Sequence, residues 1–373
     1  MGSLHFFNPG NDLALASGQR YYTPPAAAVT LAHAGTWLPL LLGEAGDMVM
    51  TASGDLPADI TGKWNHGMLV WRGEMPDSLR PWGWSPWAME YAANAFRKRG
   101  ADWDEAWEKG VDMPRLLQLT HRRTSVAVHE ALTTGLTPVE AFSTDEAEAA
   151  LHAWDKVVGK SPLSGSGRGV FHGSIRSADA FLRRCSATIA RQGSVMIEHE
   201  FVPVAEFAML FAMKRVTGIS FLGYSLFETS GDAYTSNILL PDEEIRQRLR
   251  ELCPAEDFGT LECRVTEAMR LIIDPIPYEG YFGVDMMVYD TENGTAVNPC
   301  IEVNMRTTMG VVAWNATHKL LHPASRGRFR LATMQEGHAP AGWCDGRLAE
   351  GSVNLSPADS KVAFIIDAKS RAN

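Results

Sequence analysis

The sequence predicts an α/β protein built from more than one domain. The chain has 373 residues, and chains of this length usually divide into domains of about 150 residues, two or three in number. Hydrophobic residues make up 45% and charged residues 21% of the chain. This composition is typical of globular proteins and excludes wholesale disorder and collagen-like repeats. Short apolar runs alternate with segments that carry helix-start signals, which predicts strands connected by helices.

The N-terminal part predicts an open sheet with connecting helices. The apolar run from Leu4 to Phe7 ends at the turn sequence Asn8 to Asp12, which predicts a buried strand that leads into a turn. Thr23, as a helix cap, and the two prolines after it predict a helix over 26–34, and 47–51 is the next expected strand. Ser85 and Pro86 predict the start of a helix that ends near Arg99.

Tryptophan is concentrated in this same part of the chain. Six of the eleven tryptophans lie between Trp64 and Trp103. We expect a packed aromatic core with a loop edge, and a substrate-facing surface is the alternative. The charged segment 100–110 is followed by Pro114, and this change in composition predicts a domain boundary near residue 115.

The rest of the chain predicts a smaller and a larger α/β region. A five-residue loop at 214–218 separates two apolar, aromatic runs, which is typical of a β-hairpin. The expected helices are 120–135, 144–154 with Ser143 as cap, 178–191, 242–252 and 261–272; the expected strands are 157–160, 195–197, 205–213, 219–227 and 361–367.

Charge and cysteine content narrow the class of protein. With 34 Lys and Arg against 44 Asp and Glu, the net charge is -10, so the basic footprint of a nucleic-acid-binding protein is missing. The longest apolar stretch, Trp37 to Leu42, is too short to span a bilayer, and no signal peptide is expected at the N-terminus. Five cysteines without a CxxC pair make a disulfide framework or a thiolate zinc site improbable. We therefore expect a cytoplasmic protein that binds neither nucleic acid nor membrane.

A hairpin between residues 280 and 304 carries the most informative side chains. Asn293-Gly294 is a strong hairpin signal, and a turn centred between these residues pairs positions whose numbers sum to 587. Asp285 then lies opposite Glu302, with Cβ atoms about 4.5–5.5 Å apart. Asn304 shares their face, and the other face is apolar.

This face predicts a metal site. Two carboxylates placed opposite each other repel, and the arrangement costs stability unless a cation lies between them. The oxygens of Asp, Glu and amide side chains are ligands that Mg²⁺ accepts. Waters or phosphates complete its coordination. The alternative is a solvated hairpin face with incidental charges. His318 and His322 are a second candidate metal pair, but an exposed helix end is the preferred interpretation.

Two further segments could bind a nucleotide. Lys160 ends a strand that leads into a Gly- and Ser-rich loop at 161–169, whose backbone N–H groups could cradle phosphate. The loop lacks the Walker pattern, and a mobile linker is the alternative. Further along, Glu198 and Glu200 precede a linker, and Glu206 begins a new strand where it could bind a ribose diol. An exposed glutamate is the alternative for each.

Together and in this order, these elements resemble the ATP-grasp superfamily over about 119–323, most specifically in the carboxylate-ligating signature Glu302-Val303-Asn304-Met305-Arg306. The resemblance implies that Asp285, Glu302 and Asn304 hold Mg²⁺, with two ions expected and Mn²⁺ as a substitute. It further implies that Lys160 binds the α- and β-phosphates and that Arg306 faces the γ-phosphate and the acyl group, so these two are the expected catalytic residues. The implied nucleotide contacts are Arg122 or Arg123 (with Arg123 taken as the phosphate-binding cation), Ser164, Gly165, Gly167 and Gly169 of a closing loop, backbone near Glu198, Glu200 and Phe201 at adenine, and Glu206 at ribose.

The sequence departs from the D-alanine type of ligase at two places. That type has an arginine two residues before the metal aspartate, where this chain has Gly283, and a lysine in the segment that corresponds to 232–240, where this chain has none. Arg306 or Arg168 could supply the missing positive charge. These departures bear on the substrate, while the nucleotide site is unaffected.

We expect three parts: an N-terminal Rossmann-like open-sheet domain (1–115), a lid subdomain (116–197) and a C-terminal metal and substrate subdomain (198–373). The expected activity is ATP-dependent ligation of a small-molecule carboxylate, such as an amino acid or peptide, to an amine through an acyl phosphate. A small-molecule kinase and a non-catalytic nucleotide-binding module are the alternatives. The turn Asn8 to Asp12 is expected to contribute to the acceptor site, and a homodimer is left open.

Overall fold

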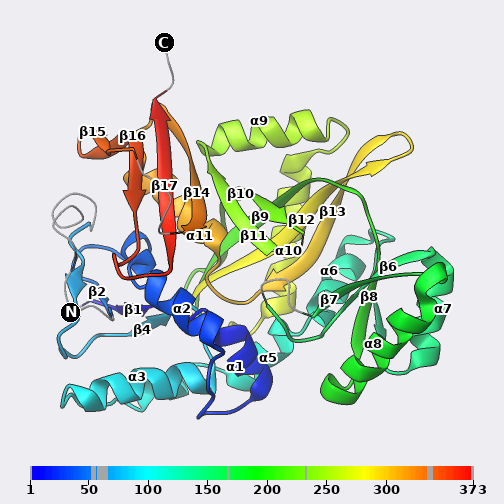
Figure 1. Cartoon of the computed structure of the whole chain (residues 1–373), viewed down its shortest axis with the longest axis horizontal. Coiled ribbons are helices and arrows are strands. Elements are labelled where there is room, and N and C mark those ends of the chain that lie inside the picture. Colours follow the sequence, from blue (N-terminus) through cyan, green and yellow to red (C-terminus); the bar gives the residue numbers. More distant parts are fainter. Residues whose placement is uncertain are drawn as a thin grey trace.

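Three β-sheets organise the chain in this computed structural model (Figure 1). The structure describes residues 2–51, 56, 66–165, 169–231, 233–333 and 339–370. Within these residues a four-stranded sheet belongs to the N-terminal part, a second four-stranded sheet to the middle, and a nine-stranded sheet to the C-terminal part. No helix in these ranges is long and apolar enough to cross a membrane.

The N-terminal sheet is parallel, which is consistent with the predicted Rossmann-like open sheet. Its order is β3-β2-β1-β4, with β1 (Leu4–Phe6) paired in parallel to both β2 (Met48–Val49) and β4 (Leu79–Pro81), and β3 (Leu69–Val70) at the edge. Because β1 lies inside the sheet, its carboxyl end is at the edge where parallel sheets commonly bind ligands. Helix α1 (Asn11–Ser17) begins directly after this end.

The helices of this part begin close to the predicted positions. Ser85 Oγ accepts the N–H of Ala88 and caps α3 (Pro86–Lys98), as predicted. The predicted Thr23 cap of α2 (Ala26–Ala34) is wrong, because Pro25 with an extended ψ of 150° is the residue that precedes the helix and no side chain caps it. The short helices η1 (Leu38–Leu41) and α4 (Ala106–Lys109) complete the region.

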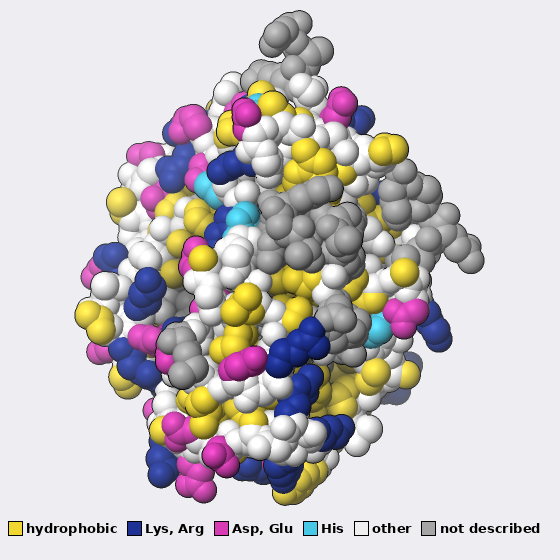
Figure 2. Space-filling view, turned by 90° about the vertical axis from the view of Figure 1, so that its left-hand side faces the viewer, with side chains coloured by type: hydrophobic (Ala, Val, Ile, Leu, Met, Phe, Trp, Pro, Cys, Tyr) yellow, Lys and Arg dark blue, Asp and Glu magenta, His cyan; other side chains and the backbone are white. Residues whose placement is uncertain are grey.

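The described tryptophans form the expected aromatic core. Trp71 is 1% exposed and lies with its ring centroid 4.5 Å from that of Phe96. Trp103 and Trp107 pack on the same Phe96 ring at 5.6 and 5.3 Å. Trp64 lies outside the described residues. Figure 2 shows one face of the molecule, on which acidic, basic and hydrophobic side chains are interspersed.

The middle sheet is antiparallel with the order β5-β8-β6-β7. Helices α5 (Met113–Thr120) and α6 (Arg123–Leu132) lead into it, and α7 (Thr144–Trp154) and α8 (Ala178–Gln192) pack on it through one apolar cluster. Ser143 caps α7, as predicted. The strands are β5 (Val139–Ala141), β6 (Lys156–Lys160), β7 (Val170–Ser174) and β8 (Val195–His199).

The large sheet has the order β13-β12-β9-β10-β11-β14-β17-β16-β15 within the described residues. The predicted hairpin is confirmed as β9 (Pro203–Lys214) and β10 (Gly218–Ser230), with longer strands and a shorter turn than expected. The hairpin β12 (Gly280–Thr291) and β13 (Gly294–Asn304) follows α9 (Asp242–Leu252) and α10 (Phe258–Ile273), and α11 (Met309–Asn315) and η3 (Ala316–Leu320) come next. The remaining strands are β11 (Ala233–Leu239), β14 (Ser325–Thr333), β15 (Gly342–Cys344), β16 (Arg347–Asn354) and β17 (Val362–Ser370).

Candidate active site

The opposed carboxylates of the β12–β13 hairpin are paired as predicted, because Asp285 lies opposite Glu302 in the strand register. The predicted turn, however, is displaced by one residue, since Thr291 pairs with Gly294 and the outer register sums to 585. A bulge next to Asp285 restores the predicted pairing, because the three residues 299–301 of β13 face Met286 alone. Pro299 lies in this bulge, where a residue without an N–H is tolerated.

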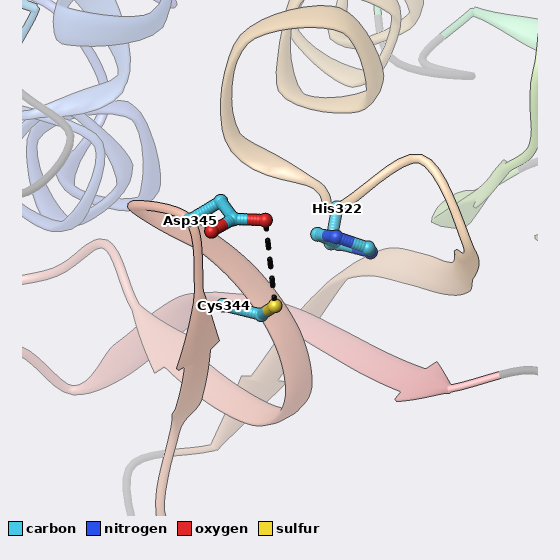
Figure 3. A group of neighbouring side chains, drawn as sticks. All are labelled: His322, Cys344 and Asp345. Carbon is cyan, nitrogen blue, oxygen red and sulfur yellow. Dashed lines mark hydrogen bonds between the residues drawn. The ribbon is translucent and has the colours of Figure 1, made fainter.

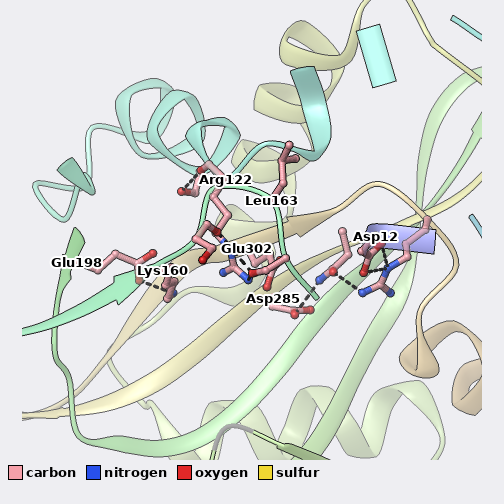
Figure 4. A network of polar contacts seen from close by, with 12 residues as sticks. Asp12, Arg122, Lys160, Leu163, Glu198, Asp285 and Glu302 are labelled. Atoms are coloured by element: carbon pink, nitrogen blue, oxygen red, sulfur yellow. Dashed lines mark hydrogen bonds and ion pairs between the residues drawn. The ribbon is translucent and has the colours of Figure 1, made fainter. Parts of the chain in front are cut away.

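Asn304 and Arg306 extend this pair into a network of polar contacts (Figure 4). Asn304 Nδ2 donates to Asp285 Oδ2 at 2.9 Å, and Asn304 Oδ1 accepts from Arg306 Nη2 at 3.0 Å. Arg306 Nε donates to both carboxylate oxygens of Asp12 at 2.8 Å. The network thus runs from the Asp285–Glu302 face of the hairpin to the first helix of the N-terminal part.

The electrostatics of the pair are those of an incompletely neutralised acidic site. Desolvation first, and the nearby Glu302 carboxylate second, raise the pKa of Asp285 to about 7, against the lowering effects of Arg306 and Asn304. Glu302 has a cationic partner, since its Oε1 lies 3.0 Å from Arg122 Nη2. Because a divalent cation would stabilise both ionised carboxylates, the residues present fit the expected Mg²⁺.

Lys160 lies beside the same hairpin. Its side chain is 7% exposed, and its Nζ lies 2.6 Å from Glu198 Oε2. The pKa of the buried Cys300 thiol, in the β13 bulge, is raised well above its usual range by burial and then by the carboxylates of Glu198 and Asp285, with Lys160 acting in the opposite direction. Glu198, Asp285 and Lys160 therefore all lie close to the buried Cys300.

The glycine-rich loop contacts the network at the residues that the structure describes. Ser164 Oγ accepts from Arg122 Nη2 at 3.2 Å, and a Cβ on Gly165 would lie 2.3 Å from Asp12 Oδ2. Gly169 has a φ of +79°, and its carbonyl accepts the N–H of Ser161 at 2.9 Å, which closes the base of the loop. The predicted contacts of Gly167 and Arg168 lie outside the described residues.

Of the two candidate arginines, Arg122 and not Arg123 lies at the hairpin, and the phosphate-binding role of either stays a prediction. Arg123 is the first residue of α6, is more than half exposed, and donates to Glu140 Oε1 at 2.8 Å, away from the hairpin. Arg122 precedes the helix, is 4% exposed in its side chain, and bonds through its backbone N–H to Pro162 O at 3.0 Å. Two adjacent residues at a helix start point in different directions, and the sequence alone left both open.

The acidic segment after β8 is placed near the site, but its members have partners of their own. Glu200 Oε1 lies 2.5 Å from His172 Nδ1, and the Phe201 ring packs between the rings of His199 and Tyr289. Glu206 accepts from Thr229 Oγ1 at 2.5 Å and is close enough to Asp285 to raise its pKa. Their roles at adenine and ribose stay predictions.

A second cluster of metal-binding side chain types lies at the β15–β16 hairpin (Figure 3). His322, Cys344 and Asp345 offer donor atoms within 4.8 Å of one another. His322 Nδ1 accepts the N–H of Ala324 at 3.2 Å, and the Cys344 thiol bonds to Asp345 Oδ2 at 3.7 Å. His318 instead bonds to the Trp314 carbonyl and to Asp242, so the two histidines do not act as a pair.

No protein-family model and no curated protein sequence matches the chain. Among solved structures, a pyruvate carboxylase from Rhizobium etli is 11% identical with a TM-score of 0.54, and the match covers 99% of this chain and 36% of that one. A biotin carboxylase from Campylobacter jejuni in a complex with an ATP ligand is 10% identical with a TM-score of 0.52, over 98% of this chain and 87% of that one.

A phosphoribosylamine–glycine ligase from Thermotoga maritima is similar to the same degree. It is 11% identical with a TM-score of 0.52, over 99% of this chain and 92% of that one. The chain therefore has the ATP-grasp fold, preceded by a parallel-sheet region. The resemblance found in the sequence is confirmed at the level of the fold.

Proposed function

We propose that the protein is an ATP- and Mg²⁺-dependent ligase that joins a carboxylate to an amine through an acyl phosphate. The observation that carries this proposal is the network in which Asp285, Glu302 and Asn304 lie beside Arg306 on one hairpin face. The similarity in fold to a phosphoribosylamine–glycine ligase supports it. The division at residues 115 and 197, the cytoplasmic location and a homodimer stay predictions.

Asp285, Glu302 and Asn304 would hold the metal. Their oxygen donors suit Mg²⁺, two ions are proposed, and Mn²⁺ is the proposed substitute. When bound, the metal supplies charge neutralisation to the terminal phosphates. Asn304 already holds Asp285 in place through its amide, and Arg122 lies against the outer oxygen of Glu302.

The nucleotide would lie between the middle and the large sheets. Lys160 and Arg122 are buried cations on the middle side of the site and would bind phosphate oxygens. For Lys160 this requires an exchange of its present partner Glu198 for phosphate. Backbone near Phe201 would contact adenine, Glu206 would contact ribose, and the loop containing Ser164, Gly165, Gly167 and Gly169 would close over the phosphates.

The proposed ligase reaction has two steps. A carboxylate oxygen of the substrate attacks the γ-phosphorus, the bond to the β-phosphate oxygen breaks, and ADP leaves. The amine then attacks the acyl carbon, phosphate leaves with the electron pair of the broken bond, and the nitrogen loses a proton. Arg306 would orient the carboxylate and balance the charge that develops on the transferred group, which is the main catalytic contribution in such reactions.

The test is an ADP-release screen with MgATP, amino acids and small peptides as carboxylates, and amines added separately. We expect phosphate release only when both a carboxylate and an amine are present. A stable phosphorylated product without an amine would indicate the kinase, and MgATP binding without any turnover would indicate the binding module.

A further inference from the structure

Asp12 lies where three separate segments of the chain meet (Figure 4). It belongs to the first turn of α1, at the end of the central strand β1. Its side chain is 14% exposed, and both its oxygens accept from Arg306 Nε at 2.8 Å across 294 positions of sequence. The third segment is the glycine-rich loop, which approaches Asp12 at Gly165.

The turn that carries Asp12 is itself fixed. Asn8 Nδ2 donates to the carbonyl of Gly83 at 2.8 Å, and the N–H of Gly83 donates back to Asn8 Oδ1 at 3.3 Å. A Cβ on Gly83 would lie 2.4 Å from Asn11 Nδ2, so the two segments are in close contact. Asn8 and Asn11 are 1% and 2% exposed, and buried amides with satisfied hydrogen bonds make a rigid base.

The same N-terminal region also holds the backbone next to Arg306. The N–H of Thr307 donates to the carbonyl of Trp82 at 2.9 Å, one residue before Gly83. The Arg306 segment is therefore anchored twice to the N-terminal part, once through its backbone and once through its guanidinium. This double anchor makes the N-terminal part a wall of the site.

The contacts of Arg306 define which of its hydrogens face outward. A guanidinium has five N–H groups in a fixed plane. Nε bonds to Asp12, one N–H of Nη2 to Asn304, and one N–H of Nη1 to the Thr307 carbonyl at 3.2 Å. Within the described part of the chain, these contacts leave one N–H on each Nη without an acceptor side chain or carbonyl, so two donors remain for a ligand.

We propose that Asp12 is a positioning residue that orients the Arg306 guanidinium toward the transferred phosphoryl group. Asp12 is the charged partner among the three, so it determines the plane of the guanidinium most strongly. Gly165 forms the outer side of the Asp12 contact, because any side chain there would displace the carboxylate. The position of Gly165 and the orientation of Arg306 are in this way connected through one carboxylate.

This inference rests on the proposed function, and its test needs no knowledge of the substrate. The probe is MgADP with aluminium fluoride, which mimics a phosphoryl group in transfer, compared with MgATP as the ground-state ligand. Both affinities are measured by calorimetry for wild type, Asp12→Asn, Arg306→Lys, the double variant and the control Glu90→Gln. Glu90 also accepts from an arginine Nε, that of Arg20, but on the surface of α3.

We expect Asp12→Asn to weaken the aluminium fluoride complex at least about tenfold and to change the MgATP affinity by less than about twofold, because the asparagine keeps the size of the side chain but not its charge. In the Arg306→Lys background the same substitution should add less than about twofold, since both variants remove one interaction. Glu90→Gln should match wild type for both ligands. If Asp12→Asn does not fold, Gly165→Ala tests the same contact and should show the same selective loss.

Three results would overturn the role of Asp12: an unchanged aluminium fluoride affinity, equal weakening of both ligands, or additive effects of the two substitutions. A wild-type protein that binds no MgATP would instead overturn the proposed function on which the inference rests. The two failures are therefore distinguishable.

Discussion

Two charged regions of the large sheet are built in opposite ways. On β14, each arginine has its own carboxylate: Arg326 Nε lies 2.7 Å from Glu244, Arg328 Nη1 lies 2.6 Å from Glu228, and Arg330 Nε lies 2.6 Å from Asp367. On the β12–β13 hairpin, two carboxylates face each other and the pKa of Asp285 rises to about 7. The first arrangement is neutral without any ligand, whereas the second would be stabilised by the proposed cation.

The difference separates structural charge from functional charge. Ion pairs such as those of β14 contribute little to stability, usually below about 1 kcal/mol when solvent reaches them. Opposed and desolvated carboxylates cost stability, and such sites are common where a protein binds or catalyses. Each substitution below therefore has a matched control in the other region.

The largest expected effect is that of Glu302→Gln. Removal of one metal carboxylate should lower ligase turnover by at least about 100-fold, because developing charge in phosphoryl transfer is balanced by the bound cation. The fold should remain, as judged by thermal unfolding. Glu228→Gln is the control and should leave turnover close to wild type; persistence of turnover in Glu302→Gln would refute the metal assignment.

Arg306→Lys should come next. We expect kcat to fall more than about tenfold, which corresponds to about 1.4 kcal/mol of transition-state stabilisation, with little change in the Kd of ATP. The physical reason is that an ammonium cannot provide a bidentate planar contact. Single-turnover ADP formation measures the effect, and Arg328→Lys on β14 should be silent. Weaker ATP binding with unchanged kcat would contradict the role.

The third effect concerns stability and has opposite signs in the two regions. Because the folded pKa of Asp285 lies above that of the unfolded chain, near 3.8, the metal-free protein loses stability as pH rises from about 4 to about 7. Asp285→Asn should therefore raise the free energy of unfolding at pH 8 by about 1 kcal/mol or more, with no gain at pH 4. Asp367→Asn should lower it slightly at pH 8, and urea denaturation without Mg²⁺ at both pH values decides. A loss of stability at pH 8 in Asp285→Asn would contradict the electrostatic account.

The smallest effect is expected in the amide hydrogen exchange of the glycine-rich loop. MgATP should increase the protection of segment 161–169 against hydrogen exchange by a few fold, because the loop would close over the phosphates. The β15–β16 turn at residues 345–346 serves as the internal control and should not respond. Equal protection of the loop with and without MgATP would contradict its closure.

Local patterns in the sequence predicted much of the β12–β13 hairpin. The pairing of Asp285 with Glu302 was predicted correctly although the turn was misplaced by one residue. The extra residues of the bulge at 299–301 shift the register back to the predicted one. A bulge depends on tertiary contacts, such as the 2.8 Å bond between His129 Nε2 and the Cys300 carbonyl, and no short-range signal reports it. The contact of Asp12 with Arg306 could not be predicted for the same reason, because it joins residues 294 positions apart.

The region around β14 was largely not predicted from the sequence. Strands β14, β15 and β16 were not predicted, because glycine and proline interrupt the apolar runs in this part of the chain. For β14 a signal did exist: Arg326, Arg328 and Arg330 alternate with Gly327, Phe329 and Leu331, which is the period of a strand. An arginine-rich strand resembles a solvated segment until its carboxylate partners, which come from other elements, are known.

The bulge in β13 has a consequence for changes in chain length. Because it sets the pairing at Asp285, the outer arms of the hairpin are not what aligns the two carboxylates. The tip at residues 291–294 is exposed, and exposed hairpin tips accept inserted residues. A peptide tag or a fluorescent reporter placed between Glu292 and Asn293 should therefore be carried by the molecule while the spacing of Asp285 and Glu302 stays as it is.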